Sequence, residues 1–249
     1  MIGIFDSGSG GLTVLREIKK LLPKADIVCF GDFRNAPYGN KTAEELGVLT
    51  VLGIQRLLSL GVTQIVTACN SVSASILKPM FDFPDIKQTE IIEMVGPTTR
   101  ALGGRKDARI LLVATEATVR SGIYQDSFRD AGIYIDALPL PHLAGAIEEG
   151  TSVPGMKGMV RNSLENIIKD YDVLILGCTH YPLIREIFDD IVGDVKIFDP
   201  AESVAKEVKE RFEGKGEGKL KFVISRDSKF FRDKVSELFG DMATIEILK

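Results

Sequence analysis

The chain has few of the residues that mark disulfide-rich or metal-rich proteins. It contains no tryptophan, two histidines and three cysteines among 249 residues. The cysteines, Cys29, Cys69 and Cys178, are odd in number and widely spaced, which does not describe a disulfide framework and predicts free thiols in a reducing compartment. Cys29 lies inside the apolar stretch DIVCFG without polar neighbours, so we expect it in the core.

Long hydrophobic runs and blocks of one charge are also absent. No apolar stretch reaches the roughly 20 residues that a membrane-spanning helix requires, and MIGIFDSGSGG lacks the basic, apolar and small-residue segments of a secretory signal. The net charge is -4, with lysines and arginines interleaved among the acids. We therefore expect a cytoplasmic protein with no membrane partner and no nucleic-acid partner.

What the chain does have is an alternation of short apolar runs with segments of helical periodicity. The pattern predicts a mainly parallel sheet architecture with helices on both faces, in which ligands gather at the carboxyl ends of the strands. Helices are expected at 11–22, 43–60, 153–170 and 202–213. Strands are expected at 2–5, 26–31, 63–68, 89–95, 108–114, 133–138, 172–177, 195–198 and 219–225.

The two halves of this pattern resemble each other. Cys69 follows Asp6 by 63 positions, and Cys178 follows Thr115 by the same 63 positions, each residue standing at the end of an expected strand. The spacing has two interpretations: a coincidence between strand-helix units of similar length, or two related α/β lobes. In the second case each lobe delivers one cysteine to a sheet edge, and a ligand between the edges has a thiol on each side.

Two facing thiols suit proton transfer at an amino-acid α-carbon, because inversion needs a base on one face and an acid on the other. A free thiol has a pKa of about 8.5, within reach of neutral pH. His180 follows Cys178 by two positions and is a candidate proton relay, and Asp6 is expected near Cys69. The stretches DSGSGG, CNSVSAS and CTHYPL supply hydroxyls and helix starts that can hold a carboxylate.

Six motifs occur in order along the chain: IGIFDSGSGGLTVLREI, PYGNKT, VTACNSVSAS, TEATVRSGIY, AIEEG and LILGCTHYPLI. Together they resemble the glutamate racemases of the cofactor-independent aspartate/glutamate racemase superfamily. The resemblance runs from about residue 2 to 190 and continues more weakly beyond. It implies two pseudo-symmetric lobes, each a mainly parallel sheet flanked by helices, with the active site in the cleft between them. We place the first lobe at 1–94 plus 205–249 and the second at 95–204.

The resemblance also implies an activity, the interconversion of L- and D-glutamate without cofactor or metal, supplying D-glutamate for peptidoglycan. Cys69 matches the base for the D enantiomer and Cys178 the base for the L enantiomer, while Asp6, His180 and Glu148 match residues that assist. The residues that match substrate-binding positions are Ser7, Pro37, Tyr38, Gly39, Asn70, Ser71, Thr118 and Thr179. Whether Glu148 or Glu149 lines the site stays open, and a homodimer is compatible with the sequence.

The chain departs from the family pattern at several positions. Phe33 stands where a small hydroxyl residue is common, Ser71 replaces threonine, and Arg226 replaces glycine. These departures leave the substrate less certain than the reaction type, so a racemase for aspartate or another amino acid is an alternative. Two others are a zinc hydrolase with Cys69, Cys178 and His180 as ligands, and a non-catalytic two-lobed amino-acid-binding protein.

Overall fold

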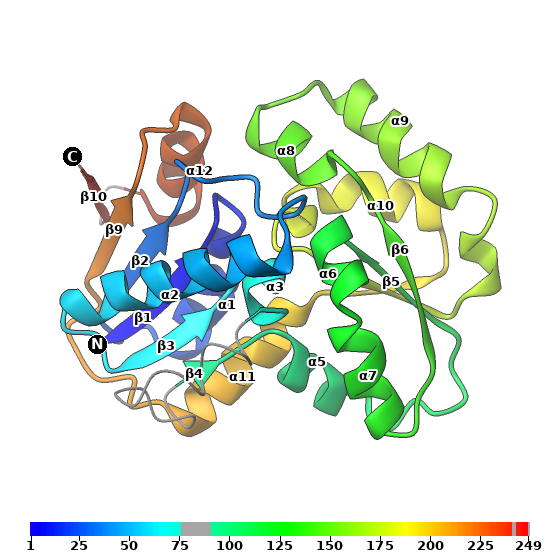
Figure 1. Ribbon diagram of the computed structural model, residues 1–249, viewed down its shortest axis with the longest axis horizontal. Helices are drawn as coiled ribbons and strands as arrows, with labels where there is room; N and C mark the ends of the chain where they lie inside the picture. Colours follow the sequence, from blue (N-terminus) through cyan, green and yellow to red (C-terminus); the bar gives the residue numbers. More distant parts are fainter. Residues whose placement is uncertain (76–90, 241–242, 249) are drawn as a thin grey trace.

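The computed structural model describes residues 1–75, 91–240 and 243–248, which form two parallel β-sheets with helices on both faces (Figure 1). The strands of the larger sheet are β1 (Ile2–Asp6), β2 (Ile27–Gly31), β3 (Gln64–Thr67), β4 (Ile91–Ile92), β9 (Leu220–Ile224) and β10 (Ala243–Ile247). Those of the smaller sheet are β5 (Ile110–Ala114), β6 (Ile135–Pro139), β7 (Val173–Gly177) and β8 (Lys196–Phe198). The α/β fold class expected from the sequence is confirmed.

The strand orders reveal the internal repeat. The larger sheet has the order β10-β9-β2-β1-β3-β4 and the smaller sheet has the order β6-β5-β7-β8. Within each sheet, the strand that opens the repeat lies between its second and third strands, and every described pairing is parallel. The spacing of 63 positions therefore reflects two lobes with the same strand order, β2-β1-β3-β4 and β6-β5-β7-β8.

Helices cover both faces of each sheet. The larger sheet packs against α1 (Gly11–Leu21), α11 (Pro200–Arg211) and α12 (Lys229–Phe239) on one face, and against α2 (Ala43–Ser59) on the other. The smaller sheet lies between α8 (Leu143–Glu148), α9 (Val153–Leu164) and α10 (Arg185–Val192) on one side, and α5 (Val95–Leu102) and α7 (Ile123–Asp130) on the other. Because apolar side chains point to both faces of these buried strands, their sequences read as continuous apolar runs.

Local chemistry explains where several helices begin and end. Thr42 and Glu45 form a capping box at the start of α2, and Asp199 accepts a hydrogen bond from Ala201 at the start of α11. The helix expected over 153–170 is interrupted: α9 ends at Leu164, Ile167 donates to the Leu164 carbonyl, and a separate 3-10 turn follows over Ile168–Asp170. Residues 89 and 90 of the expected strand at 89–95 lie outside the described residues.

The chain crosses between the sheets twice, before α5 and before α11. Helix α11 packs against α1, and its buried residues Val204 and Val208 belong to the core of the larger sheet. The expected lobe boundary between residues 204 and 205 thus falls inside this helix, and the division of the chain into those two units stays a prediction. In the described part of the chain, none of the helices combines the length and apolar character needed to span a bilayer.

Candidate active site

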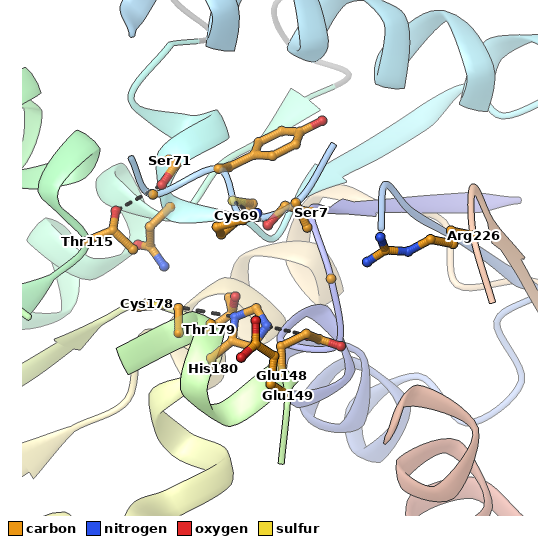
Figure 2. Close-up of a pocket in the computed structure, with 18 residues that line it drawn as sticks. Ser7, Cys69, Ser71, Thr115, Glu148, Glu149, Cys178, Thr179, His180 and Arg226 are labelled. Atoms are coloured by element: carbon orange, nitrogen blue, oxygen red, sulfur yellow. Dashed lines mark hydrogen bonds and ion pairs between the residues drawn. The ribbon is translucent and has the colours of Figure 1, made fainter. Parts of the chain in front are cut away.

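A cavity of about 100 Å³ lies where the carboxyl ends of the two sheets face each other. Figure 2 shows the two cysteines on opposite sides of this cavity, one from each lobe. The cavity is lined by Ser7, Gly8, Ala36, Pro37, Tyr38, Gly39, Cys69, Asn70, Ser71, Thr115, Ala144, Gly145, Glu148, Glu149, Cys178, Thr179, His180 and Arg226. By contrast, Cys29 is buried in the core of the larger sheet, as expected.

Cys69 directly precedes a short helix, α3 (Asn70–Ser73), at the carboxyl end of β3. Its side chain is buried, and the Ser7 hydroxyl lies 3.6 Å from the sulfur. Burial raises the pKa of the Cys69 thiol to about 12, and the negative charge of Asp6 adds to the rise. The raised pKa favours the protonated, neutral form of this thiol at physiological pH.

Cys178 lies beside a histidine, whereas Cys69 lies beside a serine. The Nδ1 atom of His180 is 3.9 Å from the sulfur of Cys178. The other ring nitrogen of His180 lies 2.7 Å from Glu148 Oε2. Burial alone disfavours the imidazolium, but the contacts with Cys178 and Glu148 outweigh it and hold the pKa of His180 well above its usual range. The second lobe thus places His180 between the sulfur of Cys178 and the carboxylate of Glu148, with one ring nitrogen near each.

Glu148 is fixed by the opposite lobe. Ser9 donates to it twice, from its backbone N–H to Oε2 at 2.8 Å and from its hydroxyl to Oε1 at 2.6 Å. Burial disfavours the Glu148 anion, yet the hydrogen bonds from His180 and Ser9 outweigh it and lower the pKa of Glu148 below its usual value. Ser9 is a residue that sequence reasoning missed, and its place in DSGSGG was the only available signal.

Asp6 also joins the lobes, although it does not line the cavity. Its carboxylate accepts hydrogen bonds from Gly8 N at 2.8 Å and from the Thr179 hydroxyl at 3.0 Å. Burial raises the pKa of Asp6, and the nearby His180 cation opposes the rise. The carboxylate makes no hydrogen bond to Cys69, so the structure connects Asp6 to the first cysteine only through charge.

A cluster of hydroxyls closes one end of the cavity. The Ser71 hydroxyl lies 3.0 Å from that of Thr115 and 3.4 Å from that of Thr118 (Figure 2 shows the first pair). Thr118 is fully buried behind this wall and does not line the cavity. Thr115 does line it and was not among the predicted binding residues, although its position at a strand end was visible in the sequence.

Asn70 offers an amide to the same end of the cavity. Its Oδ1 accepts a hydrogen bond of 2.6 Å from the hydroxyl of Tyr124, a residue of the other lobe. Its Nδ2 atom is buried and has no hydrogen-bond partner among the described residues. Because a buried donor without a partner is costly, this N–H group is suited to binding an anionic ligand.

The loop with Pro37, Tyr38 and Gly39 is positioned by a buried acid. Asp32 accepts hydrogen bonds from the hydroxyls of Tyr38 at 2.7 Å and Ser225 at 2.8 Å. Because the tyrosine hydroxyl is committed to Asp32, Tyr38 offers the cavity its ring and backbone. A side chain at Gly39 would press against Thr115, whose Cβ would lie 2.8 Å away, so this close approach requires glycine.

Glu148 and Glu149 both line the cavity, but only Glu148 contacts His180. Phe33 is buried against Phe231, with ring centroids 5.1 Å apart, and does not enter the cavity. Arg226 does line it.

The ligand set of the zinc alternative is missing. Among residues 1–75, 91–240 and 243–248, no three histidine, cysteine, aspartate or glutamate side chains are grouped so that they could hold a metal ion. Cys69, Cys178 and His180 line one cavity without converging on a common point. The geometry thus supports proton transfer between two separated sulfurs better than metal chemistry.

Comparison with known proteins identifies the family. The family model described as Asp/Glu/Hydantoin racemase matches residues 8–208. The glutamate racemase of Aquifex aeolicus is 32% identical over 249 residues, covering 96% of this chain and 94% of the relative. The chain belongs to the Asp/Glu/Hydantoin racemase family. It is an amino-acid racemase and acts on a small molecule, which leaves the zinc hydrolase and the non-catalytic binding protein without support.

Solved structures agree with this assignment. Glutamate racemase isoform RacE1 from Bacillus anthracis superposes with a TM-score of 0.87 at 28% identity, covering 100% of this chain and 97% of that one. Glutamate racemase from Francisella tularensis, described as a complex with D-glutamate, has a TM-score of 0.84 at 25% identity, covering 100% of this chain and 97% of that one. This racemase therefore shares its two-sheet α/β fold with structurally known family members.

Proposed function

We propose that this racemase interconverts L- and D-glutamate by proton transfer through Cys69 and Cys178, without a cofactor. The observation that carries the proposal is the arrangement of the two thiols, which come from opposite lobes and line the same cavity. The names of its relatives, and the D-glutamate complex of the Francisella tularensis protein, support glutamate as the substrate.

The reaction needs one base and one acid, and the two cysteines differ accordingly. The thiolate of one cysteine removes the α-proton, so that a Cα–H bond breaks and an S–H bond forms. The electron pair left on Cα delocalises into the adjacent carboxylate. The thiol of the other cysteine then protonates the opposite face of Cα and becomes a thiolate. Cys69 is suited to the acid role by its raised pKa, and Cys178, on the opposite side of the cavity with His180 Nδ1 at 3.9 Å from its sulfur, takes the base role.

The polar groups around the cavity provide for the rest of the substrate. The unpaired Nδ2 atom of Asn70 and the hydroxyl of Ser71 are placed to bind the α-carboxylate. Of the remaining predicted binding residues, Ser7, Pro37, Tyr38, Gly39 and Thr179 line the cavity, whereas Thr118 supports Ser71 from behind. We propose further that the D-glutamate produced enters peptidoglycan.

The test is incubation with L-glutamate, and separately with L-aspartate, in deuterated water, following optical rotation and α-deuterium. Two-base racemization of glutamate is expected to invert the centre and to place solvent deuterium in the product enantiomer. Deuterium uptake without inversion would refute the two-base scheme, and activity on aspartate alone would refute the choice of substrate. Cys69→Ser and Cys178→Ser are each expected to abolish racemization while retaining ligand binding, and a chelator is expected to have no effect.

A further inference from the structure

Arg226 is a cation at the rim of the cavity with no carboxylate of its own. It lies two positions after the last residue of β9, Ile224, and is exposed. Among the described residues its guanidinium makes no ion pair or hydrogen bond. The adjacent acid, Asp227, forms its ion pair with Arg232 at 2.6 Å and not with Arg226. The charge of Arg226 is therefore free to meet a ligand.

The backbone that carries Arg226 is firmly positioned. The preceding residue, Ser225, is buried; its hydroxyl donates to Asp32 at 2.8 Å and accepts a hydrogen bond from Arg34 N at 2.8 Å. Asp32 also accepts from Tyr38, whose loop forms part of the cavity wall. The hydrogen bonds of Asp32 therefore position both the backbone next to Arg226 and the loop that carries Tyr38.

The charges that line the cavity explain what Arg226 contributes. His180 and Glu148 form an ion pair and cancel each other. Glu149 adds a negative charge at the rim, and Arg226 is the one remaining cation among the lining residues. Without Arg226 the rim would carry a net negative charge and would repel a ligand with two carboxylates.

The position of Arg226 distinguishes between the two carboxylates of such a ligand. In the view of Figure 2, Ser71 and Thr115 lie on one side of the thiols and Arg226 on the other, with its guanidinium directed toward Ser7. A ligand whose Cα lies between the sulfurs and whose α-carboxylate meets Ser71 directs its side chain away from the hydroxyl cluster. We propose that Arg226 binds the side-chain carboxylate of the substrate and so selects a dicarboxylic amino acid over its amide.

This inference rests on the proposed function and is tested by Arg226→Gln in the full chain. The matched control is Lys229→Gln, which also removes one positive charge and lies three positions after Arg226. The side chain of Lys229 is 89% exposed and does not line the cavity. For Arg226→Gln we expect the KM for glutamate to rise about tenfold with kcat within twofold, because a partly exposed charged hydrogen bond is lost. Lys229→Gln should stay within twofold in both constants, and Arg226→Lys should recover part of the loss. Equal KM values for Arg226→Gln and Lys229→Gln would overturn the proposal.

Direct binding separates this inference from the reaction itself. Calorimetric titration with glutamate and with glutamine should show that the intact chain prefers glutamate and that Arg226→Gln removes the preference by weakening glutamate alone. That result without any racemization would refute the proposed function and support the role of Arg226. No binding of glutamate, or an unchanged preference in the variant, would refute the role of Arg226. If Arg226→Gln folds poorly, the salt dependence of the intact chain provides the test. Its KM for glutamate should rise severalfold between low and high ionic strength, because salt screens an exposed charge. A constant KM would refute the proposal.

Discussion

Gly10 lies directly before α1 at the contact between the lobes, and replacing it with alanine tests how tightly His180 is held. A Cβ atom at this position would collide with Thr179 Oγ1 and would lie 2.7 Å from His180 Nδ1. The backbone φ of Gly10 is -58°, which alanine adopts without strain. The substitution therefore perturbs the contact between the lobes and leaves the local backbone conformation unaffected.

The size of the effect on stability and activity depends on the contacts of the two displaced side chains, Thr179 and His180. Thr179 donates to Asp6 at 3.0 Å, and His180 contacts Glu148 at 2.7 Å, so neither side chain can move without weakening one of these hydrogen bonds. Overpacking of this kind lowers the free energy of unfolding by about 1–3 kcal/mol. A displacement of about 1 Å at a catalytic group lowers activity about 100-fold. We expect Gly10→Ala to remain folded, with a Tm several degrees lower and kcat/KM reduced by about two orders of magnitude.

The assay combines thermal unfolding with racemization kinetics. Gly158→Ala in α9 is the control, because a Cβ atom there meets nothing within 4 Å and alanine favours the helix by up to about 1 kcal/mol. The control should keep full activity and unfold at the same or a slightly higher temperature. A Gly10→Ala protein with kcat/KM within threefold of the original and an unchanged Tm would show that the lobes are not packed as described.

Two further substitutions test the polar contacts of the site. Glu148→Gln removes the anion that helps to raise the pKa of His180, so the imidazolium should lose its proton at lower pH. The alkaline limb of the pH profile of kcat/KM should then move to lower pH. An unmoved limb would exclude His180 as the group that titrates there. Tyr124→Phe removes the 2.6 Å donor to Asn70 Oδ1, which should raise the KM for glutamate about fivefold to tenfold with a smaller change in kcat, as measured by steady-state kinetics; a lower kcat at constant KM would contradict a role in binding.

Much of the architecture could be predicted from the sequence, because apolar runs and helical periodicity reflect burial directly. Helices α1, α2 and α11 lie close to their expected ranges, and the equal spacing of the two cysteine motifs corresponds to equal strand order in the two sheets. Strand β10 was missed, because all five of its residues are exposed or half-buried at the sheet edge and it lacks a continuous apolar run.

The site was predictable where chemistry is local and unpredictable where it joins distant segments. His180 lies two positions from Cys178, so their contact could be inferred. Ser9 and Glu148 are 139 positions apart, and no local pattern shows that a serine in the first glycine-rich turn holds an acid of the other lobe. Likewise Phe33 occupies a position that suggested an altered substrate, but its ring is buried in the core.

The strand order of the larger sheet has a consequence for synthesis of the protein. β1 and β2 precede the smaller sheet in the chain and are made before it, yet β2 pairs with β9, which follows that sheet. The four strands of the smaller sheet come from one continuous segment and can pair while the C-terminal residues are still being translated. On the ribosome, the lobe that begins first is therefore completed last, and the free edge of β2 must avoid wrong partners until β9 emerges.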